Sequence, residues 1–228
     1  ISSRWREDDA LEIVRGAEVT PEAPYELVER MRASSAVLGP LLASMGRASV
    51  AMPGGDDFGS RPIDMHLQGL EALGATFELE HGVIRGRVDT LIGAEVVLEY
   101  PSVGATENLL MAGVLAKGRT TIHNAAREPE IADLAAFLNR IGARVVGAGS
   151  PVIAIDGVDE LRAVEHVVIP DRIEVATFLA AVGVARGEVT LRNVRPEHVD
   201  LLVEKLGRTG LRISPDGDGL WVMASGAP

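Results

Sequence analysis

The stretch Pro129–Asp156, PEIADLAAFLNRIGARVVGAGSPVIAID, decides the fold because its parts recur elsewhere in the chain. Its first half spaces apolar residues as an amphipathic helix does, and its second half predicts a β-hairpin. The glycines that end such helical stripes recur every 68 residues: Gly74, Gly142 and Gly210. The prolines that would open these helices recur every 67 residues: Pro62, Pro129 and Pro196. This regular spacing indicates an internal repeat.

Each repeat is predicted to run strand, helix, strand, helix and hairpin, with a glycine before the middle strand at Gly46, Gly118 and Gly187. The first unit places Val28, Met31, Leu38, Leu42 and Met45 on one helical face, which Pro40 should kink or end. Its further elements are expected at Arg47–Met52, Pro62–Leu73, Thr76–Glu80 and Val83–Val88.

The other two units repeat this order. The second is expected at Ala94–Tyr100, Ser102–Ala116, Arg119–Asn124, Pro129–Ile141 and Arg144–Asp156. The third is expected at Glu165–Ile169, Asp171–Arg186, Glu188–Val194 and Pro196–Leu206, with a hairpin ending near Ala224. Asp171 and Glu174 fit the first residues of a capped helix. Ser2–Val14 resembles the closing hairpin of an earlier unit.

A βαβαββ unit cannot bury both faces of its sheet by itself, so several units must share a core. The predicted fold class is therefore α/β, with repeated βαβαββ units packed around buried helices. Residues that repeat explain this fold, and function should lie in those that do not.

Composition limits the possible functions of the chain. The 228 residues are 46% hydrophobic and 24% charged, as in an ordinary globular protein, and there is no cysteine. A formal net charge of −11 argues against a nucleic-acid partner, and no apolar run is long enough to cross a membrane. The five histidines lack the spacing of metal ligands. We expect neither a metal nor another cofactor, and a cytoplasmic location.

The loop Pro53–His66, PGGDDFGSRPIDMH, combines the features of an anion site. Its glycines allow close approach to a ligand, and Arg61 supplies a rigid fork of donors. Pro62 is suited to open a helix, with Asp64 in its first turn. Asp56 or Asp57 would serve as a general acid if burial raised its pKa. A solvated surface turn is the alternative.

Three other places carry candidate residues. Ser102-Val103-Gly104 follows a strand and opens a helix, which suits a phosphate but equally suits simple N-capping by Ser102. Arg32 flanks an apolar stripe, where an arginine often only extends to solvent. Glu128 and Glu130 flank Pro129 at a helix start, where carboxylates are stabilising without any functional role.

Several strings resemble the UDP-N-acetylglucosamine 1-carboxyvinyltransferase family of enolpyruvyl transferases. They are Met31–Ser35 with Leu38–Leu41, Pro53–Gly55 with Gly59–His66, Pro101–Asn108, Asn124–Ile131 and Pro170–Glu174. The resemblance extends from about Leu11 onward, in order and with nearly the family's spacing. It implies an inside-out α/β barrel of two domains with three units each. It also implies transfer of an enolpyruvyl group from phosphoenolpyruvate to UDP-N-acetylglucosamine, the first committed step of peptidoglycan precursor synthesis.

The resemblance also assigns roles to residues. Asp56 is the general acid of a mobile loop, and Arg32 and Arg61 face the anionic substrates. Arg61, Pro62, Ile63, Asp64 and Met65 line the uridine end, and Tyr100, Pro101, Ser102, Val103 and Gly104 the diphosphate. Glu128, Glu130 and Arg172 are further candidates for substrate contacts.

The chain departs from the family in two ways. Most relatives have cysteine where this chain has Asp56, and a subset, which includes mycobacterial enzymes, has aspartate. The family's N-terminal Lys-Asn pair, its later aspartate base and its C-terminal arginines have no counterpart here. We therefore expect a fragment, with residues 1–166 from the first domain and 167–228 from the second. Alternatives are 3-phosphoshikimate 1-carboxyvinyltransferase and a non-catalytic nucleotide-sugar-binding remnant.

Overall fold

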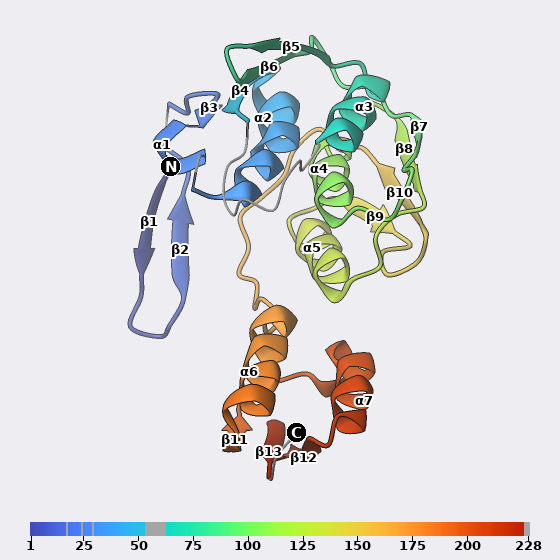
Figure 1. The fold of residues 1–228 in the computed structure, drawn as a ribbon. Coiled ribbons are helices and arrows are strands. Elements are labelled where there is room, and N and C mark those ends of the chain that lie inside the picture. The colour runs from blue at the N-terminus through green and yellow to red at the C-terminus, as the bar shows by residue number, and fades with distance from the viewer. Residues whose placement is uncertain (17, 24, 29, 53–62, 226–228) are drawn as a thin grey trace. The chain divides into compact units, whose positions relative to one another are not determined.

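The computed structural model describes residues 1–16, 18–23, 25–28, 30–52 and 63–225, and the chain divides into two compact units (Figure 1). The first unit is Ile1–Glu165 and the second is His166–Pro228. Each has its own cluster of buried apolar residues. Assignment of these units to the two domains of an enolpyruvyl transferase remains a prediction.

The first unit contains two four-stranded sheets with one shared topology. One sheet has the order β3 (Glu22–Ala23), β4 (Arg47–Ala51), β6 (Val83–Arg87) and β5 (Thr76–Glu80). The other has the order β7 (Glu95–Val97), β8 (Arg119–His123), β10 (Val152–Asp156) and β9 (Arg144–Val146). In both, the first pair is parallel and the remaining pairs are antiparallel. The predicted βαβαββ repeat is confirmed for the two repeats of this unit.

The helices of the first unit pack beside one another. They are α1 (Tyr25–Val28), the 3₁₀ helix η1 (Arg32–Val37), α2 (Leu38–Met45), α3 (Asp64–Ala72), α4 (Val103–Gly113) and α5 (Pro129–Arg140). Helix α4 contacts η1, α2, α3 and α5, and Leu109 and Leu110 on it are fully buried. In Figure 1, α2 and α3 lie beside α4, which is thus the central helix of this unit.

The repeating glycines have a common structural cause. Gly74, Gly142 and Gly210 have φ angles of 99°, 111° and 98°, and Gly46, Gly118 and Gly187 have φ angles of 68°, 92° and 105°. Residues with a Cβ avoid this left-handed region, which glycine enters freely at helix ends and tight turns. The 68-residue period therefore corresponds to the positions at which the chain reverses direction within each repeat.

The helical stripe predicted between Val28 and Met45 forms three separate pieces. α1 ends at Val28, η1 begins at Arg32 and α2 begins at Leu38. Pro40 neither kinks nor ends a helix, and this prediction was wrong. It occupies the first turn of α2, where its missing N–H would have no intrahelical acceptor.

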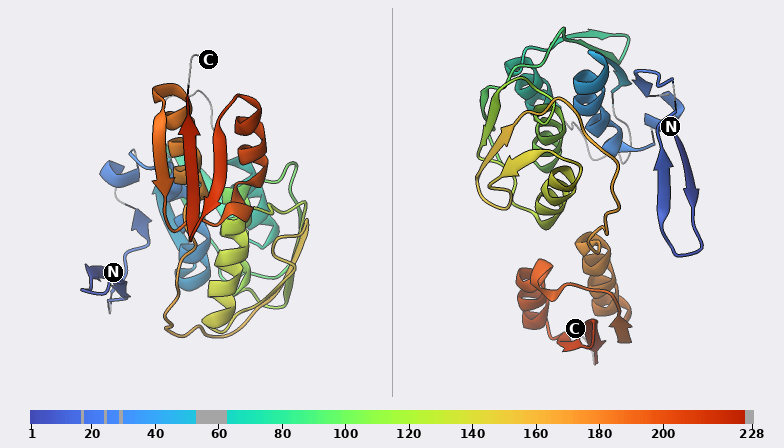
Figure 2. Two further views of the ribbon diagram at one scale, coloured as in Figure 1. Left: turned by 90° about the horizontal axis from the view of Figure 1, so that it is seen from below. Right: turned by 180° about the vertical axis from the view of Figure 1, so that it is seen from behind.

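The second unit has a three-stranded sheet covered on one face by two helices (Figure 2, left). Its elements are α6 (Arg172–Ala185), β11 (Gly187–Leu191), η2 (Pro196–His198), α7 (Asp200–Arg208), β12 (Arg212–Asp216) and β13 (Gly219–Ala224). The sheet order is β11-β13-β12, which matches the last three strands of the other sheets. Asp171 caps α6 as predicted, since its Oδ1 accepts from the N–H groups of Ile173 and Glu174.

The strand predicted at Glu165–Ile169 is absent, and this prediction was wrong. Val167 and Val168 are 86% and 73% exposed and belong to no strand. An apolar segment becomes a strand only when a neighbouring backbone accepts it, and here β11 pairs with β13 alone among the described residues. The helix predicted from Pro196 begins as a short 3₁₀ turn and becomes α-helical only at Asp200.

The chain begins with a confirmed hairpin. β1 (Ser2–Trp5) pairs antiparallel with β2 (Leu11–Val14), with Ser2 opposite Val14 and Trp5 opposite Leu11. Arg4 and Glu12 form an ion pair of 2.6 Å across it. Most of its residues are exposed, so the first unit's core does not depend on this hairpin.

Candidate functional site

Part of the predicted site lies outside the described residues. Asp56, Arg61 and Pro62 belong to residues 53–62, for which the structure gives no placement. Arg32 begins η1, but its side chain is likewise outside the description. The described part of the predicted site in the first unit comprises Ile63–Met65, Tyr100–Gly104 and Glu128–Glu130, and we call these residues, with the side chains that hold them, the frame.

The start of α4 provides the first part of this frame. Ser102 is the N-cap residue, and its Oγ accepts from the N–H of Ala105 at 3.3 Å. The capping alternative for Ser102 is thus realised. Within the described residues, the N–H groups of Val103 and Gly104 donate to no other group, so this turn retains donors suited to an anion. Tyr100 and Pro101 precede it and are exposed.

A buried asparagine joins this helix to three other segments. The Oδ1 atom of Asn108 accepts from the backbone N–H of Gly39 at 2.7 Å. Its Nδ2 atom donates to the carbonyl oxygen of Ser35 at 2.9 Å and lies 2.7 Å from Nδ1 of His66. One side chain of α4 therefore fixes η1, the start of α2 and the start of α3.

The start of α3 lies against the start of α4. Gly104 faces the imidazole of His66 so closely that a Cβ there would lie 2.9 Å from Cε1 and 3.1 Å from Nε2. Ile63 and Met65 are buried in the core, whereas Asp64 is exposed at the first position of α3. Of these three predicted substrate contacts, Asp64 is the one whose side chain faces solvent.

The segment after β8 closes another side of the frame. Asn124 has a positive φ of 55°, and its Nδ2 donates to the carbonyl oxygen of Leu98 at 3.0 Å. Thr106 donates through Oγ1 to the carbonyl oxygen of Ser102 and accepts from the N–H of Ala126 at 3.1 Å. These bonds tie the segment that leads into α5 to the start of α4 and to Leu98, which directly follows β7.

Carboxylates gather where α5 begins. Glu128 is the N-cap residue of α5 and accepts from the N–H of Arg127 at 2.8 Å, while Pro129 and Glu130 fill the first turn. Glu107 on α4 is half-buried. Burial raises the pKa of Glu107, and the nearby charge of Glu130 raises it further. The frame thus combines backbone N–H donors at the start of α4 with two neighbouring carboxylates, Glu107 and Glu130.

The sequence had not singled out the residues that build the frame. His66, Glu107 and Asn108 belong to the segments Gly59–His66 and Pro101–Asn108 that resemble the family, but no local pattern marks them as contacts. The signal available was a polar residue, Asn108, directly before the apolar run that begins at Leu109, in a helix predicted to be buried. Arg172 opens α6 in the second unit, where it is half-buried, and it is described with that unit alone.

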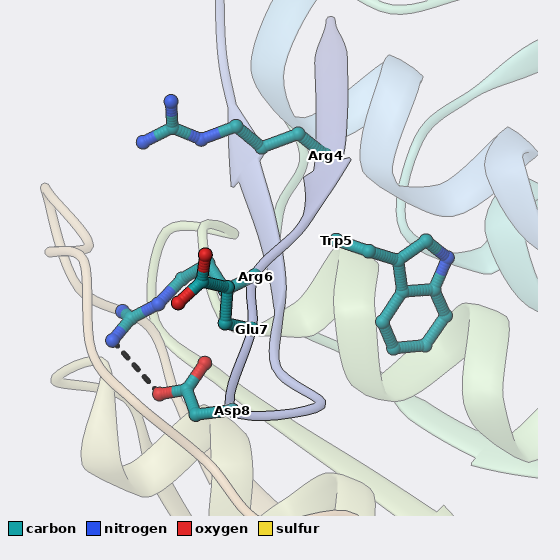
Figure 3. A pocket seen from close by; sticks show the side chains of 5 residues that line it. All are labelled: Arg4, Trp5, Arg6, Glu7 and Asp8. Carbon is teal, nitrogen blue, oxygen red and sulfur yellow. Dashed lines mark hydrogen bonds and ion pairs between the residues drawn. The ribbon is translucent and has the colours of Figure 1, made fainter.

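The turn of the β1–β2 hairpin also forms a shallow hollow, drawn in Figure 3. Its lining comes from the consecutive residues Arg4 to Asp8, and Arg6 pairs with Asp8 at 2.9 Å. The Trp5 side chain points away from this ion pair (Figure 3). Because a single hairpin lines this hollow, no separate elements converge there as they do at α4.

Among the described residues, no group of three or more histidine, aspartate or glutamate side chains is placed to hold a metal ion. In the same part of the chain, no helix combines the length and apolar character that crossing a membrane requires.

The chain is similar to several curated proteins along nearly its whole length. It is 52% identical to the UDP-N-acetylglucosamine 1-carboxyvinyltransferase of Sorangium cellulosum, over 93% of this chain and 50% of the relative. It is 53% identical to the protein of the same name from Myxococcus xanthus, over 89% and 48%. The chain thus spans about half the length of these relatives.

Solved structures share the fold. The enolpyruvyl transferase NikO from Streptomyces tendae matches with a TM-score of 0.80 at 23% identity, over 97% of this chain and 54% of that protein. EPSP synthase from Acinetobacter baumannii matches with a TM-score of 0.59 at 20% identity, over 84% and 45%. The predicted α/β fold of an enolpyruvyl transferase is confirmed.

A family model gives the broadest match. The model described as EPSP synthase (3-phosphoshikimate 1-carboxyvinyltransferase) matches residues 2–225, which is almost the entire chain. With two sheets of the same repeated topology and with relatives about half identical, the chain belongs to the EPSP synthase family.

Proposed function

We propose that this chain is part of a UDP-N-acetylglucosamine 1-carboxyvinyltransferase. The observation that carries the proposal is identity of about half over nearly all of the chain to relatives of that name. Its parent protein would transfer the enolpyruvyl group of phosphoenolpyruvate to the 3-hydroxyl of UDP-N-acetylglucosamine and release phosphate. Because the chain spans half of such relatives, the activity belongs to the longer protein and we expect this chain alone to be inactive.

In the proposed reaction Asp56 donates a proton, and Arg32 and Arg61 stabilise negative charge. A proton delivered to the methylene carbon of phosphoenolpyruvate makes the adjacent carbon electrophilic, and the sugar oxygen adds there as its hydroxyl proton passes to a base. Loss of phosphate and of a methyl proton then restores the enol double bond on the sugar. Asp56 would supply the first proton, while Arg32 and Arg61 would hold the anionic groups.

The described frame supports the placement of the sugar nucleotide. The start of α4 at Ser102–Gly104 retains backbone donors for a diphosphate, and Asp64 stands exposed at the start of α3. Pro62, Ile63 and Met65 would line the uridine end, together with Tyr100 and Pro101. Glu128, Glu130 and Arg172 remain proposed substrate contacts. No cofactor is required, and the proposed setting is peptidoglycan precursor synthesis in the cytoplasm.

The test compares two acceptor substrates on the full-length parent protein. Phosphate release is measured with phosphoenolpyruvate and either UDP-N-acetylglucosamine or shikimate 3-phosphate. We expect turnover only with UDP-N-acetylglucosamine. Turnover only with shikimate 3-phosphate would instead support the activity for which the family model is named. No turnover with either would indicate a non-catalytic nucleotide-sugar-binding remnant.

A second test concerns the loop acid. Asp56→Ala should lower kcat of the parent by a factor of about 10² to 10⁴, the usual contribution of a general acid. Asp56→Cys should keep activity and make the enzyme sensitive to the epoxide fosfomycin, since a thiolate is a better nucleophile than a carboxylate. Full turnover by the alanine variant would instead point to Asp57.

A further inference from the structure

The orientation of the Asn108 amide is determined by two backbone groups. A backbone N–H can only donate, so the atom 2.7 Å from the nitrogen of Gly39 must be the amide oxygen. A carbonyl oxygen can only accept, so the atom 2.9 Å from the oxygen of Ser35 must be the amide nitrogen. The two constraints agree, and the side chain is fully buried, so the amide has one possible orientation.

This orientation determines where His66 carries its proton. The amide nitrogen of Asn108 has hydrogens but no lone pair to offer, and it lies 2.7 Å from Nδ1 of His66. Nδ1 must therefore accept the hydrogen bond. A neutral imidazole that accepts at Nδ1 carries its hydrogen at Nε2.

The hydrogen at Nε2 lies beside the start of α4. Gly104 leaves space for the imidazole edge, because a Cβ there would lie 2.9 Å from Cε1 and 3.1 Å from Nε2. Gly104 belongs to the same turn as Ser102, the N-cap residue, and Val103. The imidazole of His66 therefore presents a donor edge to the turn whose backbone N–H groups also donate.

We propose that Asn108 is a positioning residue that holds His66 in the Nε2–H tautomer. His66 then presents a donor, rather than a lone pair, beside the first turn of α4. The functional part of this inference rests on the proposed function, in which that turn holds a diphosphate. Diphosphate oxygens accept hydrogen bonds, so the other tautomer would place a lone pair against an anionic oxygen.

The tautomer can be measured on the 228-residue chain itself. In a chain labelled with ¹⁵N at the histidine rings, Nε2 couples to both carbon-bound ring protons, whereas Nδ1 couples strongly to one. The signals of His66 are assigned by their loss in His66→Gln. We expect a protonated Nε2 and an unprotonated Nδ1 for His66. A protonated Nδ1, or rapid averaging of the two tautomers, would overturn the proposal.

Substitution of Asn108 should release the tautomer. Asn108→Asp replaces the amide nitrogen by an oxygen that can only accept, so Nδ1 of His66 should become protonated. If the aspartate variant does not fold, Asn108→Ser takes its place. Its shorter side chain should break the contact with Nδ1 of His66, so the two tautomers should average. Thr177→Ser on α6 is the control, because Thr177 bonds its own helix through the carbonyl oxygen of Ile173. An unchanged Nε2–H signal in a folded Asn108 variant would contradict the proposal.

The functional part is tested in the full-length parent. Asn108→Ser should raise KM for UDP-N-acetylglucosamine about tenfold, the effect of losing one hydrogen bond to a charged group, with a smaller change in kcat. His66→Gln should act similarly, and the double variant should add little. If the wild-type parent does not use UDP-N-acetylglucosamine, the proposed function fails while the tautomer measurement stands. If it does but the variants keep the wild-type KM, the positioning role is wrong.

Discussion

Helices α4 and α6 hold the same place in two of the repeats, α4 in the first compact unit and α6 in the second, yet their surroundings differ. Each follows the first segment of its repeat, and their N-cap residues are Ser102 and Asp171. Helix α4 is enclosed by η1, α2, α3 and α5, whereas α6 contacts α7 and its own sheet. Ile173, Phe178 and Val184 of α6 are more than half exposed. The repeat therefore specifies the path of the chain, while the helices packed around α4 or α6 decide how much of each helix is buried.

The same comparison shows where function enters. Counted from the two N-cap residues, Asn108 on α4 corresponds to Thr177 on α6. Asn108 bonds to three other segments, and Thr177 bonds to its own helix. The enclosed helix thus carries a residue that organises its neighbours, and the other helix has a locally satisfied one.

The sharpest test of the difference in burial compares Leu109 with Phe178, which occupy corresponding positions. Leu109→Ala should lower the free energy of unfolding of the first unit by about 2 to 5 kcal/mol, because it leaves a cavity in a closed core. Phe178→Ala should cost the second unit about 1 kcal/mol, since its side chain is 51% exposed. Urea unfolding monitored separately in each unit measures both. Equal losses would show that the two helices are equally buried in solution.

A second test uses two helical glycines. A Cβ at Gly39 would lie 2.4 Å from the carbonyl oxygen of Asn108, so Gly39→Ala should destabilise the first unit by about 1 to 3 kcal/mol. Gly207 on α7 has nothing within 4 Å of the corresponding point. Gly207→Ala should therefore stabilise the second unit by roughly 0.5 kcal/mol, because alanine restricts the unfolded chain. Destabilisation by both would disprove the contrast.

A third test concerns the half-buried Glu107 on α4. Its pKa is raised by burial and then by Glu130, so the folded chain binds more protons here than the unfolded chain. Stability from this group is therefore highest below its usual pKa of 4.5 and is lost as pH rises through the raised pKa. Glu107→Gln should remove this loss and stabilise the first unit at pH 7. Glu71→Gln, at an exposed position of α3, is the control, and a parallel pH profile for both variants would contradict the prediction.

The smallest expected effect lies on the β7-β8-β10-β9 sheet of the first unit. Arg119 on β8 and Asp156 on β10 face one another and form two hydrogen bonds of 2.7 and 2.8 Å. Arg119 lowers the pKa of Asp156, so this contribution is present at neutral pH and is lost as pH falls through the lowered pKa. Both groups are exposed, so Asp156→Asn should cause a slight destabilisation that salt reduces. An effect that persists at high salt and low pH would show another role for Asp156.

The repeat could be predicted because its landmarks are local. Glycines with positive φ and helix-capping side chains leave a mark at fixed positions, as Gly142 and Asp171 show. Pairing between distant segments leaves none. The strand expected at Glu165–Ile169 has the right composition but no partner, and that part of the prediction failed.

In the candidate site, too, local features could be predicted and contacts between distant segments could not. The cap at Ser102 follows from the sequence, but the bonds of Asn108 join residues 42, 69 and 73 positions away. No local pattern specifies such bonds. Asp56, Arg61 and Pro62 lie outside the described residues, so their predicted roles remain predictions.

The edge of β11 has a consequence for handling the protein. In both sheets of the first unit, a parallel strand occupies the corresponding edge, but within the described residues β11 pairs only with β13. An unpaired strand edge offers its N–H and C=O groups as a template for a strand from another molecule. The isolated chain should therefore self-associate through β11 as its concentration rises. A proline within Gly187–Leu191, at a residue whose N–H faces outward, should improve its solubility without disturbing the sheet.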